Sequence, residues 1–321
     1  MNKSSKLQAS GMVVILASLA FLVYERYQKP KTTYVIAQTQ YPPIPCGPND
    51  KLYKIYKVPN HGKFCLEKVS KDWIKNILKR GIVWEKHIVS SILQYTRKGS
   101  TAVDVGAHIG THTLFLSKAV GEKGQVIAFE PQTKIYQELL VNLQLNEIDN
   151  VRANMTALGP RYGYITMEAP KVSNEGNIGF SQGLGRDGNI VEVRSLDSYN
   201  LKNVSIIKID VEGAENMVLN GAKQTIIRNQ PVILIEIIGG AHRDDLTAGE
   251  KKKMAYTMAF LKDLGYVIPL VKGYDYVAMP KNSKFHKALQ KRFQATTRKA
   301  QKSSQTISKP SQKPKRSKPT K

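Results

Sequence analysis

Residues 101–110 read Thr-Ala-Val-Asp-Val-Gly-Ala-His-Ile-Gly, and this stretch decides the fold. A short apolar run typical of a β-strand ends at Asp104 and passes directly into a turn between Gly106 and Gly110. A helical pattern follows at residues 113–120. A strand, a glycine turn and a helix N-terminus in this order let a nucleotide-like ligand lie against bare backbone.

A second apolar strand, predicted over residues 125–130, ends in Glu130, twenty residues after Gly110. A carboxylate at this place can accept hydrogen bonds from the two hydroxyls of a ribose. We therefore predict that residues 101–130 hold an adenosine-containing cofactor.

Apolar runs and helical patterns alternate from residue 100 onward. The runs are short and almost continuously apolar, as in a parallel sheet that is covered on both faces. Strands are expected at residues 101–105, 125–130, 151–154, 206–211 and 231–238, and helices at 111–120, 132–146, 215–228 and 249–264. The fold class is therefore α/β, with a mostly parallel sheet and helices on both faces.

The last two apolar runs, residues 266–271 and 274–279, are separated only by Lys272 and Gly273. So short a link predicts an antiparallel hairpin at one edge of the sheet. Residues 155–196 interrupt the alternation with glycine-rich, hairpin-like sequence, which suits either a substrate lid or a plain surface hairpin. Helical spacing is also present at residues 71–80 and 83–93, ahead of the first strand.

The glycine turn narrows the class of cofactor. Gly106-x-x-x-Gly110 lacks the central glycine of the Gly-x-Gly-x-x-Gly motif of dinucleotide enzymes, and no Gly-Lys-Ser/Thr of a phosphate-binding loop follows it. S-adenosylmethionine suits this turn, because it has ribose and adenine but no phosphate.

The net charge of +24 is unevenly distributed. Residues 101–280 carry 18 basic and 20 acidic side chains, residues 51–100 carry 12 and 3, and residues 281–321 carry 14 and none. The high isoelectric point therefore does not make the core a nucleic-acid binder. The tail is predicted to be disordered, and it is either a nonspecific polyanion contact or merely solubilising.

Residues 7–24 contain no charged side chain and lie between basic flanks. As a helix they would span about 27 Å, close to the ~30 Å of a bilayer core. A retained single-pass anchor is favoured over a cleaved signal peptide, and the flanking charges do not fix its orientation. We predict an anchor at residues 1–27, an irregular proline-rich lead-in at 28–65, the main domain at 66–280 and the basic tail at 281–321. Cys46 and Cys65 form either one disulfide or two free thiols.

Several stretches together resemble the FkbM family of S-adenosylmethionine-dependent methyltransferases. They are Trp84-Glu85, residues 103–113, residues 128–131 (Ala-Phe-Glu-Pro), Ala157-Leu158-Gly159, residues 176–179, Leu196-Asp197 and, most distinctively, residues 207–215 (Ile-Lys-Ile-Asp-Val-Glu-Gly-Ala-Glu). The resemblance covers roughly residues 80–280. It implies a class I methyltransferase (Rossmann-like) sheet and action on a hydroxyl of a sugar or small metabolite.

The resemblance also implies roles for individual residues. Asp104, Gly106 and Gly110 would shape the methionine side of the cofactor pocket, Glu130 would bind the ribose, Ala157 would lie near the adenine, and Asp210 would face the transferred methyl group. Glu85 and His108 complete the cofactor set that we predict. A helix-start glutamate and a backbone-bonded histidine are the plainer interpretations of these last two.

A hydroxyl is a poor nucleophile at neutral pH. A base that takes the proton of this hydroxyl is therefore expected near the methyl group. Glu236 and His242 are candidates at strand ends, and we favour Asp210 and Glu212 as the catalytic residues without assigning the base. With Glu236 these two acids would also suit a divalent cation. We predict no metal, because the pattern does not place the third acid.

The sequence thus predicts a membrane-anchored methyltransferase that O-methylates a glycan or small metabolite by direct in-line transfer from S-adenosylmethionine. Methylation of a protein or nucleic acid is an alternative, as is a degenerate fold that binds polyanions through its tail. The sequence indicates no oligomeric state.

Overall fold

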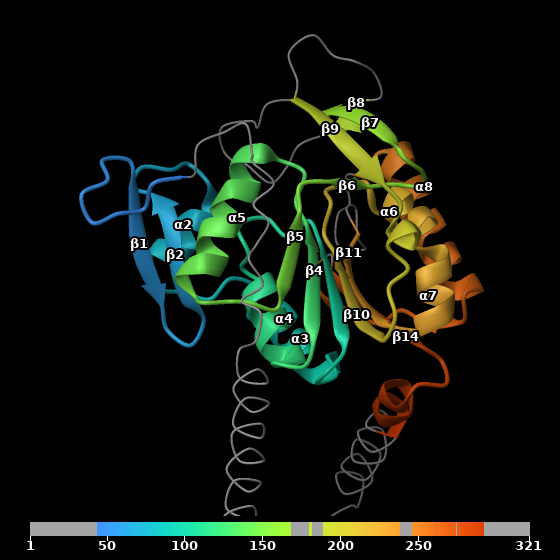
Figure 1. Ribbon diagram of the computed structural model, residues 1–321. Coiled ribbons are helices and arrows are strands. Elements are labelled where there is room, and N and C mark those ends of the chain that lie inside the picture. The colour runs from blue at the N-terminus through green and yellow to red at the C-terminus, as the bar shows by residue number, and fades with distance from the viewer. Residues whose placement is uncertain (1–43, 168–179, 182–188, 238–245, 274, 292–321) are drawn as a thin grey trace, which may run out of the picture.

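The computed structural model describes residues 44–167, 180–181, 189–237, 246–273 and 275–291 (Figure 1). Its main sheet has the strand order β12-β14-β11-β10-β3-β4-β5. The bounds are β3 Thr101–Val105, β4 Gln125–Phe129, β5 Val151–Asn154, β10 Val204–Ile209, β11 Val232–Glu236, β12 Tyr266–Val267 and β14 Asp275–Pro280. Strands β5, β4, β3, β10 and β11 are mutually parallel, and β14 is antiparallel to both β11 and β12. The predicted fold class is confirmed.

The predicted hairpin is present as β13 (Leu270–Lys272) paired with β14. However, β14 does not form the edge itself, because it lies between β11 and β12. The predicted strand at residues 266–271 is divided into β12 and β13, and both pair with β14, so three strands in antiparallel pairings extend the sheet beyond β11.

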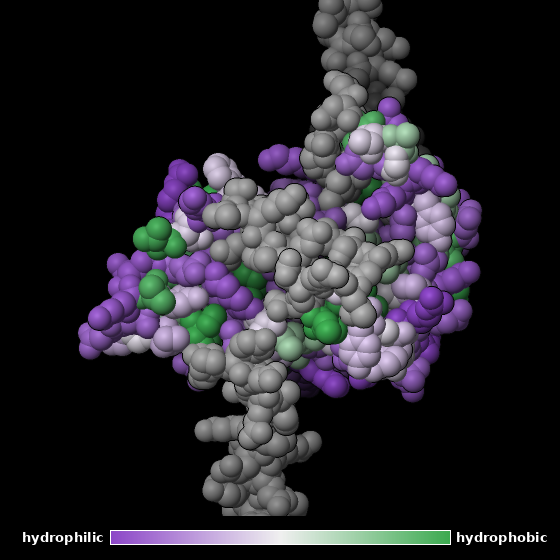
Figure 2. Space-filling view, turned by 90° about the horizontal axis from the view of Figure 1, so that it is seen from above, coloured by the Kyte–Doolittle hydropathy of each residue, from purple (hydrophilic) through white to green (hydrophobic). Residues whose placement is uncertain are grey.

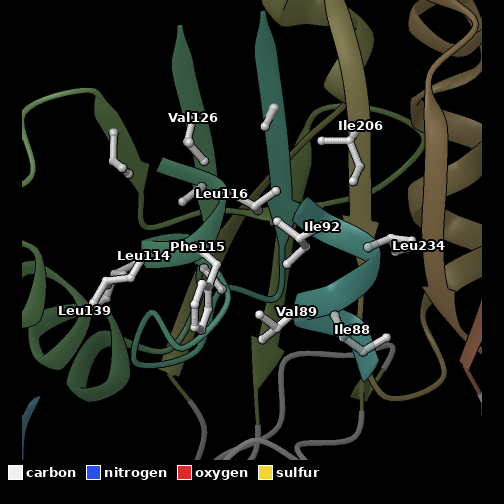
Figure 3. Close-up of a cluster of buried hydrophobic side chains, with 14 of the residues drawn as sticks. Ile88, Val89, Ile92, Leu114, Phe115, Leu116, Val126, Leu139, Ile206 and Leu234 are labelled. Carbon is white, nitrogen blue, oxygen red and sulfur yellow. The ribbon is translucent and has the colours of Figure 1, made fainter. Parts of the chain in front are cut away.

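Helices cover both faces of this sheet, since the side chains of each strand alternate between them. On one face, Figure 3 shows α3 (Lys86–Tyr95) and α4 (Thr113–Val120) packing Ile92 and Leu116 toward Val126 and Ile206 of the sheet, with α5 (Thr133–Leu145) alongside. The opposite face carries α6 (Glu215–Gly221), α7 (Lys223–Asn229), α8 (Ala248–Asp263) and the short 3-10 helix η1 (Leu196–Tyr199). Two separate apolar layers therefore hold the sheet in place.

The expected single helix at residues 215–228 is two helices, α6 and α7, which divide at Ala222. Gly221 lies so close to the small sheet that a Cβ there would stand 1.9 Å from the carbonyl oxygen of Gly159. This close approach requires a glycine at the last residue of α6, directly before the division between the two helices.

Residues 155–196 contribute a second sheet with the order β6-β9-β7-β8. The strands are β6 (Ala157–Leu158), β7 (Gly163–Met167), β8 (Phe180–Ser181) and β9 (Asn189–Arg194). In Figure 1 this small sheet sits beyond one end of the main sheet. Seen from that side, most of the coloured surface is hydrophilic and the hydrophobic residues form separate patches (Figure 2).

The irregular lead-in that we predicted for residues 28–65 ends earlier than expected. Strands β1 (Tyr53–Val58) and β2 (Gly62–Glu67) form an antiparallel hairpin, and Cys46 is bonded to the buried Cys65. Asn142 of α5 accepts a hydrogen bond from the Cys65 amide, and Asn146 bonds both backbone groups of Lys63. Of the prolines that suggested a linker, Pro59 lies in the turn between β1 and β2, and Pro45 and Pro48 precede β1.

The tail also begins later than predicted. Residues 284–291 are helical, and the ring of Phe285 packs edge-on against Tyr95 with 5.0 Å between the centroids. The remainder of the tail and the predicted anchor at residues 7–24 lie outside the described residues. Within the described part of the chain, no helix is both long and apolar enough to cross a membrane.

A buried ion pair fastens α2 (Trp73–Lys79) to α5. The Nζ atom of Lys75 lies 2.9 Å from a carboxylate oxygen of Glu138, and both side chains are fully buried. Asp72 caps the same helix by accepting a hydrogen bond from the Lys75 amide. The pair therefore fixes α2, which carries Trp73 at its start, beside α5.

We expect Lys75→Met to lower the free energy of unfolding by about 3–5 kcal/mol, because it leaves the buried Glu138 carboxylate without this cation. Urea denaturation measures the change. Lys71→Met, at an exposed lysine four residues earlier, is the control, and the double variant Lys75→Met/Glu138→Leu should recover much of the loss. Equal stability of the two single variants would contradict a desolvated pair.

Candidate active site

A cavity of about 420 Å³ opens at the carboxyl ends of the central strands. This is the point where the chain order reverses, since β4 lies on one side of β3 and β10 on the other. Open α/β sheets bind their ligands at such a switch point. The cavity is lined from the main sheet by Val105, Gly106, Phe129, Glu130, Asp210, Val211 and Glu236, from the small sheet by Ala157, Leu158 and Met167, and from the N-terminal segment by Trp73, Ile74, Trp84 and Glu85.

The turn after β3 forms the floor of the cavity. Gly106 has φ +76°, and a Cβ there would lie 1.8 Å from the carbonyl oxygen of Asp210. Asp104 and Gly110 do not line the cavity. Asp104 is completely buried and accepts a 2.6 Å hydrogen bond from the Thr113 hydroxyl, while Gly110, with φ +92°, packs toward Leu139. These two predicted residues therefore support the glycine turn from the side that faces away from the cavity.

Glu130 lies where β4 ends, with 4 % of its surface exposed. Its two carboxylate oxygens accept hydrogen bonds from the backbone amides of His108, at 2.9 Å, and Gln132, at 3.0 Å. Burial raises the pKa of Glu130 to about 7, against the opposing effect of the two amides. Each oxygen keeps a lone pair for a further donor, so the carboxylate can receive two ribose hydroxyls.

His108 lines the same cavity with a strained backbone, φ +51°. Both ring nitrogens are buried, and neither has a hydrogen-bond partner among the described residues. Burial lowers the pKa of His108 to about 4, so the imidazole is neutral. Its ring therefore carries one donor and one acceptor nitrogen beside the cavity, both without a partner among the described residues.

Lys208, near the carboxyl end of β10, was given no role in the sequence analysis. Its Nζ donates to the carbonyl oxygen of Gly106 at 2.8 Å and lies 3.3 Å from Asp210 and 3.5 Å from Asp104. Burial acts to lower the pKa of Lys208, but the attraction of these carboxylates outweighs it, and the pKa lies above its usual value. The signal was present in the sequence, as one lysine within the apolar run Ile206-Ile207-Lys208-Ile209.

Three carboxylates gather beside this lysine. One oxygen from each of Asp210, Glu212 and Glu236 lies within 4.8 Å of the others. Glu236, which the pattern could not place, thus joins the two predicted catalytic acids, and the group has a geometry that would also admit a divalent cation.

The three acids differ in protonation. Burial acts to raise the pKa of Asp210, but Lys208 and the hydrogen bond from Glu236 hold it below its usual value. Burial and the Asp210 charge raise the pKa of Glu236 to about 10. Burial and the charges of Asp210 and Glu215 raise that of Glu212 to about 7. At neutral pH, Asp210 is ionised, Glu236 is protonated, and Glu212 is divided between the two forms.

Glu85 faces this group from the start of α3, with a left-handed backbone at φ +43°. One of its carboxylate oxygens lies 3.5 Å from Nε2 of the buried His112. Burial and the charges of Asp210 and Asp275 raise the pKa of Glu85 to about 8. Glu85 is thus a helix-start residue, as the plainer interpretation has it, but it lines the cavity and is not exposed.

The structure thus brings Glu85, Gly106, His108, Glu130, Ala157, Asp210 and Glu212 to one cavity. His242, a further candidate, lies outside the described residues. Sequence reasoning missed Trp73, and it gave no role to Lys208 or Trp84, although both lie in stretches that resemble the family. Trp73 and Trp84 both line the cavity and are the two tryptophans that the chain contains.

The fold and the cavity define an α/β protein that binds an adenosine cofactor without phosphate, which is the class of the S-adenosylmethionine-dependent methyltransferases. No lysine or arginine is among the described residues that line the cavity, in keeping with a cofactor that needs no anion cradle. The model of the methyltransferase FkbM domain matches residues 104–268, about half of the chain. The chain therefore belongs to the FkbM methyltransferase family, and its cofactor is S-adenosylmethionine.

Individual proteins resemble the chain more distantly. "Methyltransferase 1" of Beauveria bassiana (strain ARSEF 2860) is 28% identical over 145 residues, which cover 38% of this chain and 58% of that relative. A methyltransferase FkbM from Methylobacillus flagellatus KT is 18% identical with a TM-score of 0.41, over 64% of this chain and 53% of that one. A SAM-dependent methyltransferase from Aquifex aeolicus is 16% identical with a TM-score of 0.38, over 61% and 88%.

We expect Glu130→Ala to weaken S-adenosylmethionine binding by about 1–3 kcal/mol, the scale of losing hydrogen bonds to a charged group. Calorimetric titration of the full chain measures the affinity. Glu147→Gln, at an exposed turn at the other end of α5, should bind as the native chain does. Unchanged affinity in Glu130→Ala would remove Glu130 from the cofactor site.

Proposed function

We propose that the chain transfers a methyl group from S-adenosylmethionine to a hydroxyl oxygen of a glycan or a small metabolite. The observation that carries this proposal is the pairing of an ionised Asp210 with a Glu212 that titrates near neutrality, both at the carboxyl end of β10. When bound, the cofactor supplies an activated methyl group on a sulfonium. The protein then has to align an oxygen and accept its proton.

Asp210 suits the aligning role. Its charge is maintained by Lys208 at 3.3 Å, so its carboxylate can accept a hydrogen bond from the acceptor hydroxyl throughout the physiological pH range. Glu212 suits the proton-accepting role, because a base works best when its pKa lies near the operating pH. In our proposal Asp210 therefore positions the acceptor and Glu212 takes its proton.

The composition of the cavity supports a neutral, ring-shaped acceptor. Trp73 and Trp84 offer flat apolar faces, and Trp73 is 63% exposed. The carboxyl groups nearby offer hydrogen bonds to hydroxyls, and the described lining supplies no cation that would hold a phosphate or a carboxylate. A sugar ring combines an apolar face with hydroxyl edges and meets both requirements.

We further propose that residues 7–24 anchor the domain to a membrane. The uncharged stretch between basic flanks supports the anchor. The Cys46–Cys65 disulfide supports an oxidising compartment for the domain. The basic tail after residue 291 would then contact acidic glycans or head groups nonspecifically.

Glu212→Gln should lower the rate of methyl transfer by about 10²–10⁴-fold, the range that a positioned base contributes. In the native chain kcat/KM should rise with pH through an inflection near the pKa of about 7, since Glu212 must lose its proton first, and this rise should be absent in Glu212→Gln. The assay follows a labelled methyl group into fractionated glycans, lipids, proteins and nucleic acids. A label confined to protein or nucleic acid would overturn the proposed acceptor class.

Removal of residues 1–27 should release the protein from membranes. We expect the full chain to stay in the pellet after alkaline carbonate extraction and the shortened chain to appear in the supernatant. N-terminal sequencing of the membrane form checks that the stretch is retained. A mature N-terminus beyond residue 20 would instead identify a cleaved signal peptide.

A further inference from the structure

At one end of the described cavity, carboxyl groups outnumber the positively charged side chains. Glu85, Asp210, Glu212 and Glu236 all line this end. The nearby cation, Lys208, is buried and already contacts Asp210 and Asp104. The end of the cavity beside β10 and β11 therefore attracts positive charge from a ligand.

The neighbouring elements add further titratable groups. Among the described residues, they add no second lysine or arginine in contact with the carboxylates of Glu85, Glu212 or Glu236. From β14, Asp275 pairs with Glu236 in the strand register and bonds His87 of α3 at 2.5 Å. From α4, the buried His112 is held neutral, because burial keeps its pKa well below the usual value. From α6, Glu215 accepts a hydrogen bond from the Gly213 amide. Lys253 of α8 donates to the Gly213 carbonyl and is exposed.

Because these acids are buried close together, three of them have raised pKa values and bind protons more tightly than usual. The pKa is about 10 for Glu236, about 8 for Glu85 and about 7 for Glu212, mainly because each is buried and next to Asp210. Protons are thus stored at this end of the free cavity at neutral pH. An added positive charge within 4–6 Å would lower such a pKa by about 1–3.

The strand order places the cofactor's charge over these acids. Glu130 follows β4, Gly106 follows β3 and Asp210 follows β10, on three adjacent strands, which lie about 4.8 Å apart. A ligand whose ribose rests on Glu130 and which passes over Gly106 brings its sulfur end to Asp210. This direction rests on the cofactor placement used in the proposed function.

We propose that Glu85, Glu212 and Glu236 form a proton-exchanging seat for the positive charge of S-adenosylmethionine. The seat gives up a proton when the sulfonium cofactor binds and keeps it when the neutral thioether product, S-adenosylhomocysteine, binds. Donor binding thereby ionises Glu212, so that the base is ready when the methyl group is in place. The product loses this attraction, which favours exchange of product for fresh donor.

Calorimetry of the full chain in two buffers of different ionisation enthalpy tests the proposal. At pH 7.5 we expect release of about one proton per S-adenosylmethionine bound, since Glu85 and Glu212 titrate in this range, and markedly less for S-adenosylhomocysteine. Both ligands carry the same amino and carboxyl groups, so the difference isolates the sulfonium. The affinity ratio of donor to product should rise about threefold to tenfold per pH unit from pH 6 to pH 8.

Glu212→Gln and Glu236→Gln should each reduce the proton release and flatten the pH dependence of this ratio. Glu147→Gln is a matched control, because Glu147 is exposed and has a similar backbone, φ +54° against +50° for Glu212. If the variants unfold, the comparison of donor and product on the native chain still decides.

Equal proton release with both ligands, or none with the donor, would overturn the proposal. Proton release by Mg²⁺ alone, together with loss of donor binding in chelator, would assign the acids to a metal ion and also overturn it. The test uses no acceptor, so failure of the proposed O-methylation leaves its outcome untouched.

Discussion

The buried ammonium of Lys208 is the interaction on which the cavity depends. It joins the turn after β3, through the carbonyl of Gly106, to the end of β10, through Asp210. It also compensates the fully buried Asp104. Removing one partner of such a group leaves the other charges uncompensated in a low-dielectric environment. Burial acts to raise the pKa of Asp210, and Lys208 opposes this effect, so that the pKa stays below its usual value.

The N-terminal segment and the small sheet complete the cavity around the Lys208 contacts. The N-terminal hairpin and α2 are fastened to α5 by Asn142, Asn146 and the Lys75–Glu138 pair, and so carry Trp73 to the mouth of the cavity. The small sheet supplies Ala157, Leu158 and Met167 from the opposite direction. The two sides of the cavity are thus built from different segments of the chain around one shared floor.

Sequence patterns predicted the central sheet well because buried parallel strands are nearly continuous apolar runs, and the run at residues 101–105 coincides with β3. They also placed Glu130, Asp210 and Glu212, since each follows such a run directly. The N-terminal hairpin was not predicted, because the contacts that hold it come from distant parts of the chain: Phe64 and Leu66 pack into the core of the main sheet, and α5 bonds its backbone. Glu236 and Lys208 gain their importance from neighbours on adjacent strands, which a linear pattern does not show.

The contact between Gly106 and the Asp210 carbonyl has a consequence for motion. With no room for even a methyl group between them, the two backbone segments are in direct contact, and Lys208 ties them from below. The ends of β3 and β10 are therefore held together, and in the proposed reaction they form the donor side and the acceptor side of the cavity. In the proposed reaction, the separation of donor and acceptor is thereby set by the backbone of two adjacent strands.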